Sequence, residues 1–252
     1  FVMGFEMKKS NETKFAKTLG ISRSEAESTA DRFNEIAISS GKSFITAEKL
    51  LNAQMEIAEA TGITAGFTEE QLKSQLILTS KLGLAADEAG KLAMFSTLTD
   101  KTTKSINTEI LDEVANLEKS TGIRVDGREV IKEVANISGQ LSANYKNDPK
   151  LIAKAVIQAK KLGLTLEEAK DISEQLLDFE SSIEAELQAE LLTGKALNLE
   201  RARSLALQGK SAEAAAEIAE QIGSSAEFAE MNVLAQQSLA KAAGMNVDQL
   251  AN

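Results

Sequence analysis

Cysteine, histidine and tryptophan are absent from this chain of 252 residues, and proline and tyrosine occur once each, as Pro149 and Tyr145. Without cysteine there can be no disulfide, and without cysteine or histidine the usual zinc sites are excluded. Catalytic systems that need a Ser-His-Asp or a Cys-His arrangement are excluded as well. The carboxylates, lysines, serines and tyrosine that remain form no pattern that identifies a reaction. We therefore expect no enzymatic activity, no metal and no cofactor.

The scarcity of proline and of aromatic residues, which make up 4% of the chain, argues against a turn-rich β-protein. Alanine, leucine, glutamate, lysine and glutamine, which are good helix formers, dominate instead. We predict an all-α fold of multi-helix modules without paired strands. Helices should cover more than about 60% of the residues, against the usual third.

The net charge is −10, which disfavours a specific nucleic-acid partner because phosphates would be repelled. No apolar run reaches the roughly 18 residues that a membrane-spanning helix needs. The chain opens with FVMGFEMKKSNE and has no initiator methionine. We expect it to be a piece of a longer polypeptide.

A phrase of similar residues occurs four times, as AKTLGISRSEAES, TSKLGLAADEAGK, AKKLGLTLEEAKD and AKAAGMNVDQLAN. Each copy places a glycine where a helix would end, followed by an aliphatic residue and a second helix start. Glycine ends helices because it adopts positive φ without a Cβ penalty. Three copies then have the spacing of a capping box, whereas Ala85 in the second copy has no side chain that could cap. The phrase predicts helical hairpins with corners at Gly20, Gly83, Gly163 and Gly244.

Either a generic hairpin corner or a true internal duplication explains the four copies. The segment SANYKNDP at 142–149 is the best candidate for a linker, and Asp148 with Pro149 suits the start of a helix. We therefore predict one helical region over residues 1–147 and another over residues 148–252.

The longest predicted helix runs over residues 166–193. Apolar residues recur along it at spacings of three or four, which places them on one face. Such a stripe either fills the core of its own domain or meets a copy of itself. Because the flanking helices are short, we predict a homo-oligomeric contact, with three copies favoured. Its residues are Ile172, Leu176, Phe179, Ile183, Leu187 and Leu191.

Carboxylates are densest in DFESSIEAELQAELL at 178–192, where Glu180 and Glu184 share a face, as do Glu186 and Glu190. Paired carboxylates can hydrolyse glycosides, but that chemistry also needs a cleft and a shielded acid. A solvated helix face is the simpler interpretation. The neighbouring LLTGKALN lacks the complete pattern of a phosphate-binding loop. We interpret its Gly194 as a helix stop and Asn198 as the cap of the next helix.

Three strings in the last third of the chain carry a resemblance to a known family. They are FESSIEAELQAELLTGKALNLERAR at 179–203, EIAEQIG at 217–223 and EFAEMNVLAQQSLAKAAGM at 227–245. This part of the chain resembles tail tape-measure proteins of tailed bacteriophages, as an internal or C-terminal segment. The first 160 residues are similar only in general character, being helical, rich in alanine and lysine, and interrupted by glycine corners.

The resemblance implies a structural protein of the virion tail. Tape-measure proteins are long and helical, lie as several copies inside the tail tube and set its length. One end is held at the baseplate or tail-tip hub, and the protein leaves before the DNA, with transient contact with the host membrane in some cases. The density of glycine corners predicts a compact module at the hub end rather than a straight ruler.

Two other classes stay open. A membrane-active helical protein would carry lysine-rich polar faces opposite aromatic ones, and liposome leakage would detect it. A carboxylate-based peptidoglycan hydrolase would clear cell walls, and Glu180→Gln would abolish that clearing.

Overall fold

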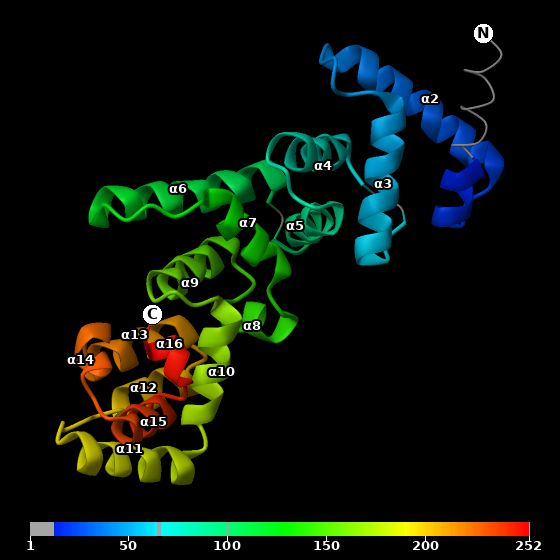
Figure 1. The fold of residues 1–252 in the computed structure, drawn as a ribbon. Helices are drawn as coiled ribbons and strands as arrows, with labels where there is room; N and C mark the ends of the chain where they lie inside the picture. The colour runs from blue at the N-terminus through cyan, green and yellow to red at the C-terminus, as the bar shows by residue number, and fades with distance from the viewer. Residues whose placement is uncertain (1–12, 65–66, 100, 252) are drawn as a thin grey trace. The chain divides into compact units, whose positions relative to one another are not determined.

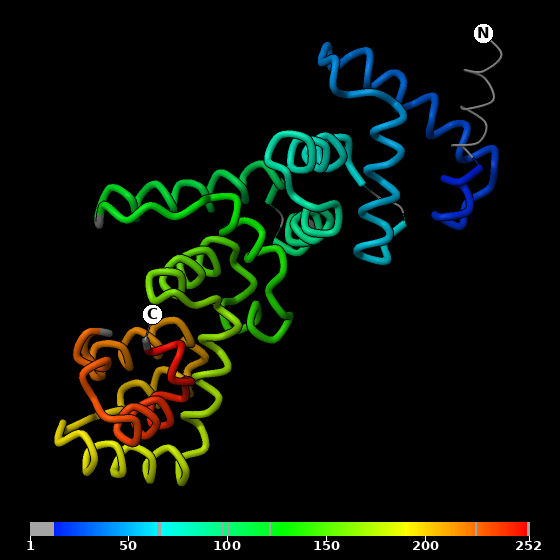
Figure 2. The backbone as a smooth tube through the Cα atoms, in the orientation of Figure 1, coloured from blue at the N-terminus to red at the C-terminus, as the bar shows by residue number. Residues whose placement is uncertain are grey.

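A computed structural model describes residues 13–64, 67–99 and 101–251 (Figure 1). The fold is all-α, with 76% of the residues in helices, and the described residues contain no strand. The predicted fold class and the predicted helical content are thereby confirmed. The helices are joined by short connections, so the backbone turns sharply at each corner (Figure 2).

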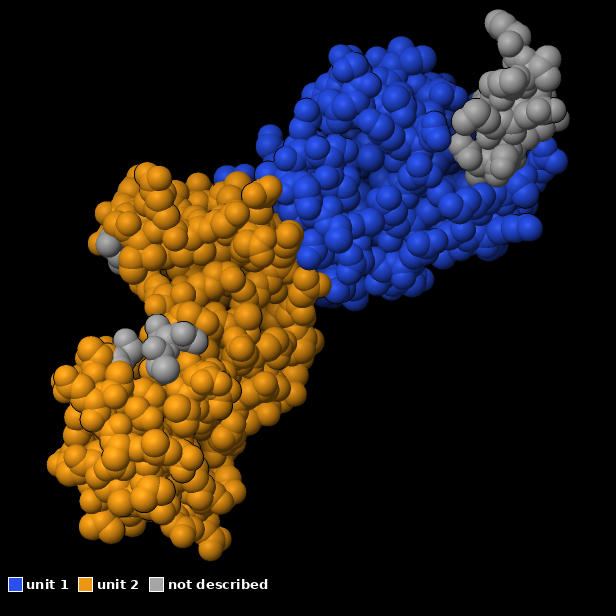
Figure 3. Space-filling view, in the orientation of Figure 1, with its two compact units in different colours: residues 1–109 blue, residues 110–252 orange. Residues whose placement is uncertain are grey.

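The chain divides into two compact units, residues 1–109 and residues 110–252, which Figure 3 draws in different colours. The division falls within the helix α6, Thr103–Thr121. The boundary that the sequence suggested at 147–148 lies inside the second unit instead. Each unit is described separately below.

The segment 142–149, which the sequence suggested as a linker, forms a tight turn between the helices at 139–144 and 149–161. Lys146 and Asn147 adopt positive φ values of 59° and 52°. The Ser142 hydroxyl donates to Asn147 Oδ1 at 2.9 Å, and the Asn147 amide donates to the Ser142 carbonyl at 2.9 Å. Polar turn residues thus serve a local turn here rather than a domain boundary. Asp148 caps the next helix and Pro149 occupies its first turn, as predicted.

The first unit packs its helices around a core of large apolar side chains. Phe15, Phe33, Leu50, Ile57 and Leu72 are among its fully buried members. Residues 13–19 are helical, and the named helices are α2 Arg23–Ser40, α3 Ala47–Thr61, α4 Glu69–Lys81, α5 Ala86–Thr99 and the first part of α6.

Helices α3 and α5 approach each other closely in this unit, and a glycine lies at their contact. A Cβ atom on Gly90 would lie 2.9 Å from the Cβ of Ala60 and 3.5 Å from the Cα of Ile57. Only a residue without a side chain fits at this distance. Gly90 therefore sets the spacing of the two helices at the centre of the first unit.

The second unit has a core of alanine, leucine, isoleucine and valine around α9, α10 and α13, which pack on one another. Helix α7 covers α9, and α12 packs on both α10 and α13. Its helices after α6 are α7 Gly127–Asn136, α8 Gly139–Asn144, α9 Pro149–Lys161, α10 Leu166–Leu176, α11 Phe179–Thr193, α12 Glu200–Leu207, α13 Ser211–Ile222, α14 Ser225–Ala229, α15 Val233–Ala242 and α16 Val247–Ala251.

The four repeated phrases form helix corners. Their glycines have φ values near +70°, namely 66° at Gly20, 68° at Gly83, 71° at Gly163 and 68° at Gly244. At Gly163 the amide of Leu164 donates to the carbonyl of Ala159 at 3.1 Å, which is the backbone bond of a Schellman motif. The corner therefore turns the aliphatic residue after the glycine back toward the helix that has just ended.

The capping boxes predicted after these corners are also formed. Ser22 with Glu25 and Thr165 with Glu168 make both reciprocal hydrogen bonds, and so do Asn246 and Gln249. At Ala85 only half of the box exists, because the Glu88 side chain accepts from the Ala85 amide at 2.8 Å and alanine returns nothing. The exception is the one that the sequence indicated.

Candidate functional site

The helix predicted over residues 166–193 is broken in two, which corrects the sequence interpretation. Helix α10 ends at Leu176, and α11 begins at Phe179 with Asp178 as its N-cap. The Asp178 carboxylate accepts from the Ser181 amide at 3.4 Å and from the Ser181 hydroxyl at 2.7 Å. The apolar spacing continues across this break, so periodicity alone did not reveal it. An N-cap aspartate followed three residues later by serine was the missed signal.

The break divides the six residues of the predicted self-association stripe into two groups. Ile172 and Leu176 on α10 are 2% and 1% exposed and belong to the core of the second unit. The four on α11 are exposed, with Phe179 at 43%, Ile183 at 46%, Leu187 at 61% and Leu191 at 84%. The single continuous stripe was wrong, but an apolar outward face remains on α11.

The opposite face of α11 is lined by small residues and packs against α15 (Figure 1). Ser182, Ala185 and Ala189 are its buried members. Small side chains let the two helices approach closely, while the large side chains of α11 point outward. The distribution is the reverse of an ordinary amphipathic surface helix, whose large apolar side chains face the core.

Two of the glutamates assigned to a solvated face are instead largely buried, which is a second correction. Glu186 forms an ion pair with Arg203, and their side chains are only 12% and 7% exposed. The Arg203 Nε donates to the Ser182 hydroxyl at 3.0 Å. Glu186 also accepts from the Leu199 amide at 2.9 Å, and Glu190 accepts from the Leu197 amide at 2.7 Å. These carboxylates fasten α11 to the 194–199 connection and to α12, whereas Glu180 and Glu184 are exposed.

The connection after α11 follows the interpretation given to LLTGKALN. Gly194 ends the helix with φ 69°, and the Asn198 side chain accepts from the Glu200 amide at 3.2 Å at the start of α12. The Lys195 ammonium is paired with Glu227 at 3.1 Å. The segment therefore serves helix ends and a surface ion pair.

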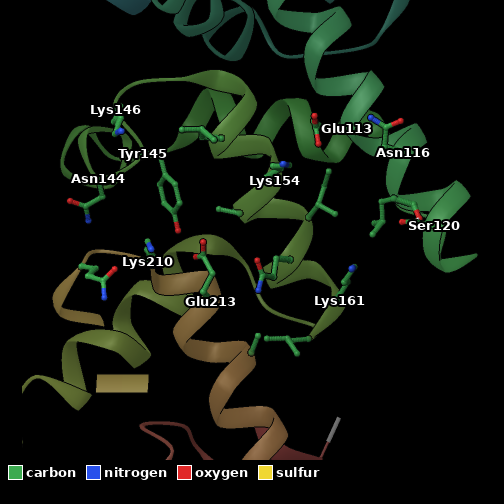
Figure 4. Close-up of a pocket in the computed structure, with 18 residues that line it drawn as sticks. Glu113, Asn116, Ser120, Asn144, Tyr145, Lys146, Lys154, Lys161, Lys210 and Glu213 are labelled. Carbon is green, nitrogen blue, oxygen red and sulfur yellow. The ribbon is translucent and has the colours of Figure 1, made fainter. Parts of the chain in front are cut away.

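A cavity of about 1280 Å³ opens in the second unit between the end of α6, the turn after α8, α9 and the start of α13 (Figure 4). No sequence pattern indicated it, because its walls come from segments about 100 residues apart. Its apolar lining includes Leu117, Leu151 and Ile157. Four lysines border it, namely Lys146, Lys154, Lys161 and Lys210.

Tyr145 reaches from the turn after α8 toward the start of α13, where Figure 4 places its hydroxyl near Lys210 and Glu213. The residue is 8% exposed. Its hydroxyl and Glu213 Oε2 are buried, and neither makes a hydrogen bond of good geometry with the described residues, although the Ser211 and Ala212 amides lie close enough to the hydroxyl to lower its pKa. Burial, and secondarily the negative charge of Glu213, raise the pKa of Tyr145 to about 12. The phenol is therefore protonated at neutral pH and is able to donate a hydrogen bond.

The cavity lysines differ from most other cations of the second unit. Nine of its lysines and arginines form ion pairs, with partners such as Glu113 for Lys150 and Glu217 for Arg201. Among residues 110–251, six lysines have no carboxylate within ion-pair distance, and four of these six border the cavity. The cavity therefore gathers uncompensated positive charge on a chain whose net charge is −10.

The described residues were also examined for membrane-spanning helices and metal sites. None of the helices in this part of the chain is long and apolar enough to cross a membrane. The described residues contain no group of three or more acidic side chains placed to hold a metal ion. No protein-family model, no curated protein and no solved structure matches the chain.

Proposed function

We propose that this chain is a structural component of a bacteriophage tail, as a segment of a tape-measure protein. The observation that carries the proposal is the resemblance of residues 179–203, 217–223 and 227–245 to that family. A helical content of 76% is in keeping with it. In this proposal the chain belongs to the virion, its neighbours are the tail tube and the baseplate or tail-tip hub, and it acts without catalysis.

The helix corners favour a compact module over a straight ruler. An extended helix advances 1.5 Å per residue, so a ruler needs uninterrupted helices. The longest helix described here, α6, has 19 residues, and α11 ends at a left-handed glycine after 15. We therefore assign the segment to the end of the tape measure that is held at the hub.

Self-association through the outward face of α11 is part of the proposal, with a trimer around the tail axis as the favoured state. Phe179, Ile183, Leu187 and Leu191 supply its apolar surface. A run of large apolar side chains on one exposed helix face is a common mark of a protein contact. Since Ile172 and Leu176 are buried in their own unit, they are no longer part of the contact.

The virion role can be tested on purified particles of the phage that encodes the chain. We expect its peptides in the mass spectrum of washed particles, and immunogold label at one end of isolated tails. Particles that lack the chain would contradict the proposal. Label distributed along the whole tail would contradict the assignment to the hub end.

The self-association can be tested separately with Ile183→Asp on the full chain. A charge at the centre of the α11 face should convert the oligomer to monomer in sedimentation velocity, with helicity unchanged by circular dichroism. Leu207→Asp is the matched control, because Leu207 on α12 is 65% exposed but lies outside the α11 face. A parent chain that stays monomeric at high concentration would refute the self-contact.

A further inference from the structure

The four unpaired lysines beside the cavity call for an anionic partner. Lys146 follows α8, Lys154 and Lys161 lie on α9, and Lys210 precedes α13, so separate elements bring the charges together (Figure 4). All four are exposed, so water and salt screen their mutual repulsion, and together they would attract an anionic surface. No carboxylate described in the chain lies within ion-pair distance of any of them, and Glu113 at the same cavity is already paired with Lys150.

Two buried polar atoms lie behind this rim, namely the Tyr145 hydroxyl and Glu213 Oε2. Neither atom is accessible from outside, so neither selects the partner. The exposed lysines and the apolar lining are the groups that a partner could contact.

The size and lining of the cavity also favour a protein surface. At about 1280 Å³ it is larger than the 300–1,000 Å³ of ordinary small-molecule sites. Leu117, Leu151 and Ile157 give it an apolar floor beneath the lysine rim. The complementary shape is a helix face with apolar side chains in the middle and carboxylates beside them.

The outward face of α11 has this composition. Glu180 and Glu184 are exposed and have no ion-pair partner among the described residues, and Gln188, one turn further on, is exposed and offers an amide donor. Ile183 and Leu187 form the adjacent row of the same face and are 46% and 61% exposed. Residues spaced by three and four share one face of a helix, so these five side chains form a single surface.

We propose that the cavity of one copy binds the outward face of α11 from a second copy. The inference rests on the proposed self-association and names the surface that receives α11. Carboxylates of the second copy would meet the cavity lysines, and its apolar side chains would cover the apolar floor. Because donor face and receiving cavity are different surfaces, the contact is head-to-tail, and the proposed trimer requires a rotation between copies that closes the ring.

Charge reversal on the full chain tests this docking. Lys154→Glu with Lys161→Glu reverses the cavity, and Glu180→Lys with Glu184→Lys reverses the α11 face. We expect each double variant alone to associate at least about tenfold more weakly than the parent chain in sedimentation velocity at low ionic strength. An equimolar mixture of the two double variants should regain association as mixed pairs, because the charges match wherever the two variants meet. A closed ring of three is not restored, since one of its contacts would join two copies of the same variant.

Lys119→Glu with Lys241→Glu is the matched control, since these are the two unpaired lysines of the second unit that do not line the cavity. The control should associate like the parent.

Several outcomes overturn the docking. If the cavity reversal associates like the parent while Ile183→Asp does not, α11 makes a contact elsewhere and only this inference fails. If the mixture gains nothing, the charges do not meet. A monomeric parent chain defeats both the docking and the self-contact, while the tail role is judged separately from purified particles.

Discussion

Ion pairs described in residues 13–109 stay close in sequence, whereas several in residues 110–251 join separate helices. In the first unit they link residues four apart, as in Arg23–Glu27 and Lys73–Glu69, or eight apart in Lys101–Glu109. In the second unit Arg203 on α12 pairs with Glu186 on α11, and Lys160 on α9 pairs with Glu133 on α7.

The difference follows from the side chains available to each core. The first unit buries Phe15, Phe33 and several leucines, and its buried polar side chains are neutral. Gln54 and Gln75 there donate to backbone carbonyls, that of Thr64 in a loop at 3.1 Å and that of Ala86 at the start of α5 at 2.9 Å. The second unit is richer in buried alanine, which brings helices close but contributes little apolar area. Its helices are additionally cross-linked by charged groups, so a single substitution there should have larger effects.

The largest expected effect is that of Arg203→Ala, which leaves Glu186 buried without its partner. Breaking a buried ion pair on one side costs about 3–5 kcal/mol. Urea unfolding should show this loss in Tyr145 fluorescence, which reports the second unit alone because the chain has one tyrosine and no tryptophan. The double variant Arg203→Met with Glu186→Gln removes both charges. Its free energy of unfolding should therefore be close to that of the parent chain and well above that of Arg203→Ala. An unchanged midpoint in Arg203→Ala would show that the pair is not a cross-link.

Next in size is an alkaline loss of stability that is specific to the second unit. The pKa of Tyr145 is raised to about 12 by burial and by Glu213, above its value of about 10 in the unfolded chain. The stabilisation that comes from burying the protonated Tyr145 is therefore fully present below pH 10 and is lost between pH 10 and 12. The total loss of unfolding free energy is about 2–3 kcal/mol. Absorbance of the single phenolate gives the pKa directly. Tyr145→Phe should lack this component, and a phenolate midpoint near 10 would contradict the buried placement.

A pair of glycine substitutions compares corners of the two units. Gly83→Ala in the first unit has open space around the new Cβ, so only the positive φ is penalised, at about 1 kcal/mol. A Cβ on Gly244 would lie 3.0 Å from the Ile172 carbonyl oxygen and 3.3 Å from the Gln175 Cβ. Gly244→Ala should therefore cost more, about 2 kcal/mol. Equal losses of unfolding free energy would show that the contact with α10 is unimportant.

The smallest effect is expected for Gln75→Leu in the first unit. The substitution removes the hydrogen bond to the Ala86 carbonyl, but it also removes Gln75 Oε1, which is buried without a partner among the described residues. The two changes oppose each other, so unfolding measured by far-ultraviolet circular dichroism should shift by no more than about 1 kcal/mol. A loss of unfolding free energy as large as that of Arg203→Ala would show that a neutral buried contact in the first unit matters as much as the ion pair in the second.

Local signals in the sequence predicted the corners and caps well, because Gly163 or Thr165 with Glu168 act within a few residues of chain. The break at Asp178 was missed because the apolar spacing continues through it. That spacing carries no information on whether a residue caps a helix. The pairing of Glu186 with Arg203 and the position of Tyr145 beside Glu213 depend on packing between distant helices. No spacing rule within one segment could have indicated them.

The close spacing of the helix corners has a kinetic consequence. Some helices pack on the next helix in sequence, as α3 does on α2 and α13 on α12, so part of the core forms by closing short loops, and such all-α chains fold on the order of milliseconds or faster. The contacts of α5 with α3, α13 with α9 and α15 with α11 close longer loops and should form later. A chain of this kind, drawn out straight and released, would regain its folded form at once, without disulfides to re-pair.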